Sequence, residues 1–342
     1  MKGSKVLKIE LEGYGSFFGT KQGTLLVRDK DRKETTYPLF ENEIGTVVLR
    51  TGNLASVGAL ATCGFFGINV LIMTQRGNPV AVLRSLEDDS HVKTRICQYE
   101  SLNNGKLEYI MKKLVIAKAE GYDQVLKKQG LRPIGYVKDD VTAIQANNEA
   151  TLRSRIMSYE SKFSKRYFDQ IFRLFDERYR PEGRNTFLAY DGLNNTFNLG
   201  YEILNWRVHV SVLQSRLEPF LGYLHALKCG KPSLVLDLME IYRYMVDDLI
   251  ISFCRDVTAK DFVFKIEKRH NRQGKRQYLN KAMEREFRKR LNALFQSTVK
   301  IPRIMHGKKQ QFETLISEEA LLLAKYIRGE RKEWTPRIVN LT

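Results

Sequence analysis

The sequence contains no pattern typical of a zinc cluster, a secreted disulfide framework or a membrane span. Its four cysteines, Cys63, Cys97, Cys229 and Cys254, include no Cys-x-x-Cys pair. No stretch of about 20 residues stays apolar. The first residues, MKGSKVLKIELEG, lack the apolar core of a signal peptide. Together these absences predict a cytoplasmic protein with no membrane segment.

Acidic residues are scarce relative to basic ones. The chain has 57 Lys and Arg against 39 Asp and Glu, which gives a net charge of +18 and a pI near 9.6. Between Arg255 and Lys309 there are 17 basic and 5 acidic residues, so this segment carries +12 of the total. Such an excess is typical of proteins that bind a polyanion, above all nucleic acid, although a run of charge can also be a solvated surface.

The hydrophobic pattern changes near residue 90, and no internal repeat or low-complexity tract is present. Residues 1 to about 85 form short alternating or apolar runs separated by turn residues, with VRDKDRKETT as a hairpin and NLASVGALATCGFFG as a short helix. After about residue 90, apolar residues recur at helical spacing. We predict an α+β fold, a β-sheet domain followed by a larger all-α domain. The predicted parts are a β-sheet domain at 1–85, a linker at 86–110, an α-helical domain at 111–330 and a weakly ordered tail at 331–342.

One predicted helix, TLRSRIMSYESKFSKRYFDQIFRLF, carries a carboxylate on its apolar side. The apolar stripe consists of Ile156, Phe163, Tyr167 and Ile171. Glu160 lies on that stripe, four residues after the first member and three before the second. Because burying an unpaired carboxylate is costly, Glu160 needs either a buried ion pair with Arg or Lys, or a metal. The sequence leaves both interpretations open.

Two sets of basic residues are candidate DNA contacts. The first follows one side of the same helix and consists of Arg155, Lys162, Arg166 and Arg173. The second is the densest basic run of the chain and consists of Lys268, Arg269, Arg272, Lys275 and Arg276. Both suit a phosphate backbone, and the helical stripe suits solubility equally well.

A histidine and several acids interrupt the apolar segment PFLGYLHALKCGKPSLVLDLME and its continuation. We predict that one helix starts at Pro232 and Ser233, with the serine as N-cap, and runs on to about residue 253. Its polar positions fall on one face and are Asp237, Glu240, Tyr244 and Asp247. His225 precedes the turn and could fold back on this face. This pattern indicates either a Mg²⁺ or Mn²⁺ site, or a polar helix stripe with a histidine satisfied in the core.

Three segments resemble the CRISPR-associated integrase/endonuclease of the spacer-acquisition module. ESKFSKRYF, from Glu160, resembles the family signature Glu-x-x-Ala-Ala-Arg-x-Tyr-Phe. DGLNNTFNLGYEIL, from Asp191, resembles its Asp-Pro-x-Asn…Phe-Gly-Tyr segment, and GYLHALKCGKPSLVLDLMEIYR, from Gly222, resembles its His-to-Glu segment. The segments occur in the order and spacing of the family, and the resemblance spans roughly residues 5 to 300.

The resemblance implies a metal site for Mg²⁺ or Mn²⁺ formed by Glu160, His225 and Glu240. Asp237 matches an acidic position that supports catalysis or DNA binding. Arg243 ends the motif and is either an ion-pair partner of Glu240 or Asp247, or a DNA or active-site contact. The implied architecture is a β-sheet domain that dimerises and a helical domain that is catalytic.

The implied reaction is metal-dependent transesterification, in which a 3′-OH of short foreign DNA attacks a phosphodiester at the border of the CRISPR repeat. Water in place of that hydroxyl would give endonuclease activity. The implied partners are double-stranded, branched or repeat DNA, a second copy of the chain, and a small ferredoxin-like adaptation protein. The alternative is a non-catalytic basic scaffold that binds nucleic acid.

Overall fold

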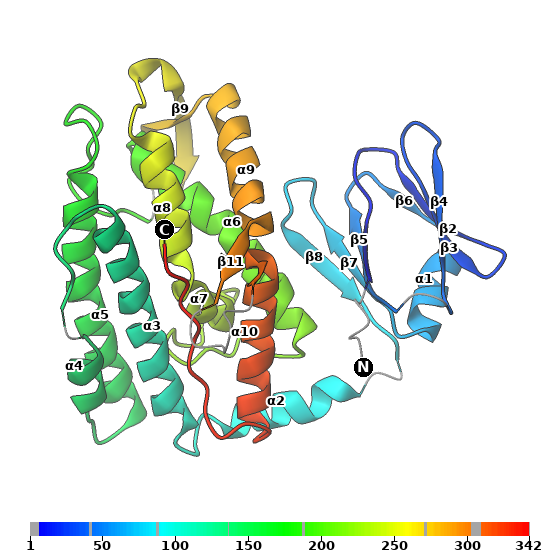
Figure 1. The fold of residues 1–342 in the computed structure, drawn as a ribbon, viewed down its shortest axis with the longest axis horizontal. Helices are drawn as coiled ribbons and strands as arrows, with labels where there is room; N and C mark the ends of the chain where they lie inside the picture. Colours follow the sequence, from blue (N-terminus) through cyan, green and yellow to red (C-terminus); the bar gives the residue numbers. More distant parts are fainter. Residues whose placement is uncertain are drawn as a thin grey trace. The chain divides into compact units, whose positions relative to one another are not determined.

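The computed structural model describes residues 7–40, 43–86, 89–135, 137–186, 189–269, 272–301 and 309–341. At 90, 268, 269, 272 and 273 it describes the backbone alone. The chain divides into two compact units, Met1–Lys93 and Thr94–Thr342. The first is built mainly of strands and the second mainly of helices, so the predicted α+β fold is confirmed (Figure 1).

The first unit consists of short strands, one complete helix and the start of a second within its described residues. Its elements are β1 (Leu7–Glu10), β2 (Phe17–Lys21), β3 (Thr24–Arg28), β4 (Glu34–Pro38), β5 (Ile44–Arg50), β6 (Leu54–Ala55), α1 (Val57–Phe65), β7 (Asn69–Met73) and β8 (Pro79–Leu83). The expected hairpin is β3 with β4, and the expected short helix is α1, which begins after the N-cap Ser56. The polar residues that interrupt the apolar runs therefore mark the real turns.

Two four-stranded sheets form this unit. One has the order β1-β5-β7-β8, with β5 parallel to both β1 and β7, and β8 antiparallel to β7. The other has the order β4-β3-β2-β6 and is antiparallel except for the short β2–β6 pairing. Buried side chains from both sheets and from α1 form one core, which includes Phe18, Leu25, Val47 and Cys63.

The second unit contains a bundle of helices and two strand pairs. The helices are α2 (Ser90–Glu100, which starts in the first unit), α3 (Lys106–Lys128), α4 (Val137–Ala143), α5 (Glu149–Phe172), α6 (Gly192–Gln214), α7 (Ser233–Glu240), α8 (Arg243–Cys254), the 3-10 turn η1 (Ala259–Asp261), α9 (Lys281–Gln296) and α10 (Phe312–Ile327). The strand pairs are β9 (Phe262–Arg269) with β10 (Arg272–Leu279) and β11 (Thr298–Lys300) with β12 (Lys309–Gln311). The part of the chain predicted to be all helix thus also holds two hairpins.

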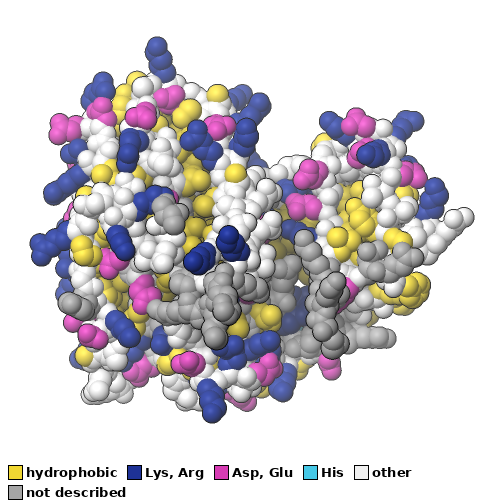
Figure 2. All heavy atoms as spheres, viewed as in Figure 1, with side chains coloured by type: hydrophobic (Ala, Val, Ile, Leu, Met, Phe, Trp, Pro, Cys, Tyr) yellow, Lys and Arg dark blue, Asp and Glu magenta, His cyan; other side chains and the backbone are white. Residues whose placement is uncertain are grey.

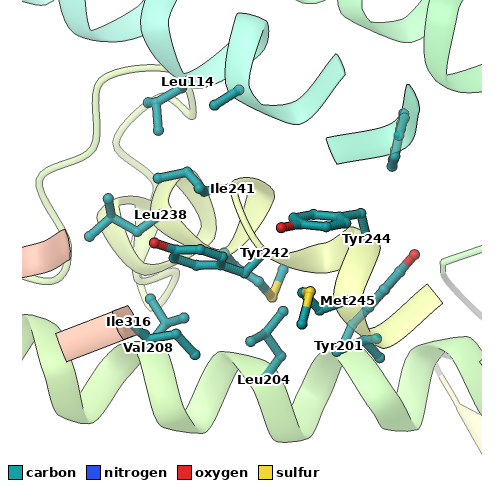
Figure 3. Close-up of a cluster of buried hydrophobic side chains, with 14 of the residues drawn as sticks. Leu114, Tyr201, Leu204, Val208, Leu238, Ile241, Tyr242, Tyr244, Met245 and Ile316 are labelled. Carbon is teal, nitrogen blue, oxygen red and sulfur yellow. The ribbon is translucent and has the colours of Figure 1, made fainter. Parts of the chain in front are cut away.

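Helices α7 and α8 lie at the centre of this unit. Figure 3 shows side chains of α7, of α8 and of the break between them (Leu238, Met245 and Ile241) between Leu114 of α3 and Leu204 of α6. The α3–α8 packing is close because Gly121 has no side chain, and a Cβ there would lie 2.5 Å from the ring of Tyr244. Helix α5 packs on the other side of α3 (Figure 1). Lys118 of α3 is thereby brought near both α5 and α7.

Two expectations about the segments outside the bundle are corrected. The stretch expected to be a linker, 86–110, contains α2 and the first turn of α3. The stretch expected to be a weakly ordered tail packs on the bundle, with Trp334 and Val339 buried. Trp334 Nε1 donates to Glu319 at 2.7 Å, and Tyr244 Oη donates to Val339 O at 2.9 Å. Apolar residues of this segment therefore belong to the core.

None of the helices in the described ranges combines the length and the apolar character needed to cross a membrane.

Candidate active site

Glu160 lies on the inner side of α5, as its position in the apolar stripe predicts. The four stripe residues are fully buried, and the N-cap Asn148 starts the helix by accepting from the amide of Thr151. The Glu160 side chain is 18% exposed and accepts a hydrogen bond from Ser164 Oγ at 2.6 Å. Its main partner is the ammonium of Lys118 on α3. The buried ion pair with a basic residue, one of the two interpretations left open, is therefore present.

Lys118 joins Glu160 to the second predicted metal ligand, Glu240. The Lys118 Nζ lies 2.6 Å from Glu240 Oε2 and also forms the ion pair with Glu160 Oε1. The Lys118 and Glu240 side chains are each only 6% exposed. Carboxylates from two helices far apart in the sequence thus converge on one cation.

His225 is held by Asp237 of α7. The carboxylate of Asp237 accepts from the amides of Tyr223 at 2.5 Å, Leu224 at 3.0 Å and His225 at 2.8 Å. It also lies 2.7 Å from Nδ1 of the His225 ring, which leaves Nε2 as the ring nitrogen available to a ligand. Asp237 is completely buried, so from this position it orients the histidine and does not face DNA.

The predicted single helix from Ser233 onward is wrong, because α7 and α8 are separate. The amides of Ile241, Tyr242 and Met245 bond three residues back, and Tyr242 has φ −119° and ψ 4°. Ser233 is not an N-cap either, since its hydroxyl donates to Ala226 O at 2.9 Å. The four polar residues predicted to share one helix face are therefore divided, two on α7 and two on α8.

Arg243 pairs with Glu240, one of the two roles left open for it. Its Nη1 lies 2.6 Å from Glu240 Oε1, and its guanidinium stacks 4.0 Å from the ring centre of Tyr201. Burial would raise the pKa of Glu240, but Arg243, Lys118 and His225 outweigh it and lower that pKa to about 2. Glu240 therefore stays ionised at neutral pH.

A second buried carboxylate, Asp247, lies behind this pair on α8. It accepts hydrogen bonds from the hydroxyl of Tyr167 at 2.9 Å and from that of Tyr201. Burial raises its pKa to about 6, although both tyrosines and Arg243 favour the ionised form. Tyr244, expected on the same face, instead bonds the backbone of Val339. Asp247 is thus fully buried, with two tyrosine hydroxyls as its hydrogen-bond donors.

A cavity of about 390 Å³ opens beside the Glu160–Lys118 pair. Lys118, Glu160, Lys165, Arg184 and Arg243 are among the residues that line it. Arg184 lies 5.2 Å from the ring centre of Tyr201 and donates to the side chains of Asn194 and Asn198. Four cations and three carboxylates, Glu160 among them, therefore line this space, and the cations suit an anionic substrate.

The predicted DNA contacts divide into exposed and buried residues. The four members of the α5 stripe are all exposed, and so is Lys275 of β10, whose ammonium lies over Phe264. Figure 2 shows Lys and Arg side chains along the left edge of the larger unit, where Figure 1 draws α5. Lys268, Arg269 and Arg272 belong to β9 and β10, but their side chains fall outside the described residues.

The prediction that Arg276 binds DNA is corrected by the structure. Arg276 was predicted to contact phosphate, but it is only 2% exposed and its guanidinium lies 5.3 Å from the ring centre of Tyr190. Its strand β10 packs against α6, and Gln277 N bonds Tyr190 O at 2.9 Å, which places this side chain on the inner face of the strand.

Glu160, Glu240 and His225 have side chains of the kinds that bind a divalent ion, although the three do not converge on one point. Within the described ranges, no three His, Cys, Asp or Glu side chains lie close enough to hold a metal together. The two glutamates nevertheless share a cation, and Glu240 Oε2 is a buried oxygen that faces the Lys118 ammonium at 2.6 Å. Two carboxylates and an imidazole nitrogen are ligands that Mg²⁺ and Mn²⁺ accept. Glu160, Glu240 and His225 are thus the residues that could hold such an ion.

Lys118 and Arg184 were missed by the sequence analysis. The signal for Lys118 was present, because it lies four residues after Leu114 and four before Tyr122, both buried on the same side of α3. A lysine on an apolar stripe requires an anionic partner for the same reason that Glu160 requires a cationic one. Arg184 lies in a loop without periodicity, and nothing in its spacing indicates that it is half-buried.

Comparison with known proteins agrees with this fold of a β-rich unit and a helical unit. The family model described as CRISPR associated protein Cas1 matches residues 10–292. The chain belongs to this family. It is 30% identical over 260 residues to a protein of Pyrobaculum aerophilum called CRISPR-associated endonuclease Cas1 2, covering 75% of this chain and 85% of that one.

Other relatives cover nearly the whole chain. A CRISPR-associated endonuclease Cas1 of Francisella tularensis subsp. novicida is 26% identical, over 93% of this chain and 94% of its own. Among solved structures, a Cas1 protein from Thermotoga maritima has a TM-score of 0.70 at 20% identity, covering 96% and 98% of the two chains. A casposase bound to an integration product has a TM-score of 0.72 at 18% identity, covering 96% and 97%. These structures share the fold of this chain.

Proposed function

We propose that this chain is a metal-dependent DNA endonuclease and integrase that inserts short foreign DNA into a CRISPR array. The observation that carries the proposal is the convergence of Glu160 and Glu240 on one cation, inside a chain whose family relatives are named endonucleases. The exposed basic stripe on α5, and the lysines and arginines in the lining of the cavity beside Glu160, support DNA as the substrate.

Glu160, Glu240 and Nε2 of His225 would hold Mg²⁺ or Mn²⁺. A divalent ion held there would polarise the scissile phosphate and stabilise the oxygens that enter and leave. Asp237 keeps the imidazole in one orientation by bonding its Nδ1 and the preceding backbone amides. Arg243 fixes Glu240, so that the carboxylate does not have to reorganise.

The proposed reaction exchanges one phosphodiester for another. The 3′-OH oxygen of the incoming strand bonds to phosphorus at the border of the repeat, and the bond to the 3′ oxygen of the repeat strand breaks. The attacking hydroxyl loses its proton and the leaving oxygen gains one. No external energy source is needed, since the number of phosphodiester bonds does not change. Water as the attacking group gives cleavage in place of joining.

We also propose that the chain works as a homodimer through its β-rich unit and together with a small ferredoxin-like adaptation protein. Solved structures of similar fold include one named a Cas6-RT-Cas1–Cas2 complex and one named a Cas1–DNA complex. These titles support a second protein and DNA as partners. Size-exclusion chromatography with light scattering, with and without the small partner, tests the assembly.

The alternative function is a basic scaffold that binds nucleic acid without catalysis. The feature in its favour is that Lys118 neutralises both glutamates, as a purely structural ion-pair network would. A scaffold would bind DNA with strong salt dependence but would neither cleave nor join it.

The test is a joining assay with a short duplex, a supercoiled plasmid that bears a CRISPR repeat, and the small partner. Reactions would contain Mn²⁺, Mg²⁺ or EDTA, and the duplex would end in a 3′-OH or a dideoxy nucleotide. We expect joined product only with a divalent ion and a 3′-OH. Equal joining in EDTA would contradict metal dependence, and DNA binding without any cleavage or joining would favour the scaffold.

A further inference from the structure

Lys118 occupies the position between the two carboxylates that the proposed metal would use. Its Nζ contacts Glu160 Oε1 and lies 2.6 Å from Glu240 Oε2, and its side chain is 6% exposed. On the same helix, the ring centre of Tyr122 lies 5.6 Å from Lys118 Nζ. These ion pairs are largely shielded from solvent, and they join three helices, α3, α5 and α7.

The charges around this lysine are already balanced. Glu160 and Glu240 contribute two negative charges, and Lys118 and Arg243 contribute two positive ones. A divalent ion between the same carboxylates would face the ammonium at short range, and like charges at such a distance repel strongly where water is excluded. The ammonium and the metal therefore cannot both keep these carboxylate contacts.

We propose that Lys118 is a built-in cation that competes with the divalent metal for Glu160 and Glu240 and thereby weakens metal binding. This inference rests on the proposed metal-dependent function. In the metal-free chain, Lys118 holds the two carboxylates in place and neutralises them. When the metal binds, the ammonium moves into the adjoining cavity, whose lining already includes the Lys118 side chain. Lys118 is thus a positioning residue that sets the metal concentration at which the site fills.

The test measures Mn²⁺ binding to the full chain without DNA, from the electron paramagnetic resonance signal of free Mn²⁺. Lys118→Met removes the charge but keeps the length of the side chain. Lys127→Met is the matched control, because Lys127 is an exposed residue of the same helix and its loss changes the net charge equally. Lys118→Arg keeps the competing charge, and Glu160→Gln removes a proposed ligand.

We expect Lys118→Met to bind Mn²⁺ at least tenfold more tightly than the wild type, while Lys118→Arg and Lys127→Met stay near the wild-type value. Without metal, the melting temperature of Lys118→Met should fall below that of Lys127→Met, because two buried carboxylates lose their shared cation, and Mn²⁺ should restore it. If Lys118→Met does not fold, Lys118→Gln provides the same comparison.

Two results would overturn the inference, and they have different consequences for the proposed function. Equal Mn²⁺ affinity for the wild type and Lys118→Met, with binding abolished in Glu160→Gln, would leave the metal site standing and reduce Lys118 to a structural counter-ion. Absence of saturable Mn²⁺ binding in the wild type and in every variant would contradict both the competition and the metal site itself.

Discussion

At the scale of the residue, three buried carboxylates in the helical unit each bind a different set of partners. Asp237 orients His225, Glu240 pairs with Lys118 and Arg243, and Asp247 accepts from two tyrosines. Each partner set has a different chemical nature: backbone amides, cations and phenols. The three acids are therefore expected to respond differently to neutralisation and to pH.

Replacing Asp237 by Asn should destabilise the fold. Oδ2 of Asp237 accepts two backbone amides and Oδ1 accepts a third together with the His225 ring, so an amide group at either position would point a donor at other donors. We expect the free energy of unfolding, measured in urea, to fall by about 2–3 kcal/mol. The control is Asp248→Asn on α8, which removes a partly exposed ion pair with Lys128 and should cost less than about 1 kcal/mol. Equal losses in the two variants would contradict the role given to Asp237.

Asp247 should make stability fall as pH rises. Its pKa is raised by burial to about 6 in the folded chain, above its value of 3.8 in the absence of that environment, so the folded state binds the proton more tightly. The stabilisation is therefore complete below about pH 4 and is lost as pH rises through about 6. We expect the unfolding free energy of the wild type minus that of Asp247→Asn to decrease by on the order of 2–3 kcal/mol between pH 4 and 7. A difference that is flat or increases with pH would contradict this.

At the scale of the element, the sequence predicts regular periodic segments well and irregular ones poorly. The stripe of α5, the strands β5 and β7, and the β3–β4 hairpin follow directly from periodicity and turn residues. The break between α7 and α8 contains no Pro or Gly, so local sequence gives no reason to end a helix there. The break is stabilised by tertiary contacts, since Tyr242 bonds Glu319 and Tyr244 bonds the C-terminal segment.

The same reasoning applies to the candidate site. Position on an apolar stripe predicts that Glu160 is buried and needs a cation, and the structure supplies Lys118. Which cation pairs with Glu160 depends on how α3 packs against α5, and the local sequence pattern does not predict that packing. The metal set itself came from a resemblance between motifs and stays a prediction. Arg276 illustrates the opposite failure, since charge alone gives no indication of which face of a strand is buried.

The C-terminal segment should contribute substantially to stability, contrary to its expected weak order. Trp334 is 2% exposed, and the buried carboxylate of Glu319 accepts its indole N–H. Trp334→Ala should lower the free energy of unfolding by about 3–5 kcal/mol, because a large cavity forms and an acceptor is left without its donor. Lys332→Ala, an exposed position two residues away, should change it by less than about 0.5 kcal/mol. Similar values for the two variants would show that the segment does not pack as described.

At the scale of the whole molecule, the net charge of +18 gives affinity for DNA, while the position of each cation decides which of them contribute. The α5 stripe is exposed along one helix. By contrast, Arg243 and Lys118 form ion pairs with the buried Glu240, and the buried Arg276 lies over an aromatic ring. Binding to a duplex should therefore depend on the stripe much more than on the buried cations.

Changing the four stripe residues to Gln should weaken duplex binding and flatten its salt dependence. The slope of log K against log salt should decrease in magnitude by about 0.9 for every phosphate that the protein no longer neutralises. Fluorescence anisotropy across a range of salt concentrations measures this slope. Arg276→Gln removes a buried cation and should leave the slope unchanged. An unchanged slope in the quadruple variant would exclude α5 as a DNA-binding surface.

The most direct test of the proposed active site is strand transfer by His225→Ala beside His209→Ala, a second half-buried histidine with no acidic partner among its described contacts. Both would be assayed with Mn²⁺, the small partner and a plasmid bearing a CRISPR repeat, at DNA concentrations that give equal occupancy. We predict that His209→Ala joins DNA at nearly the wild-type rate and that joining by His225→Ala falls by at least a hundredfold. Equal joining by the two variants would contradict the active site proposed here.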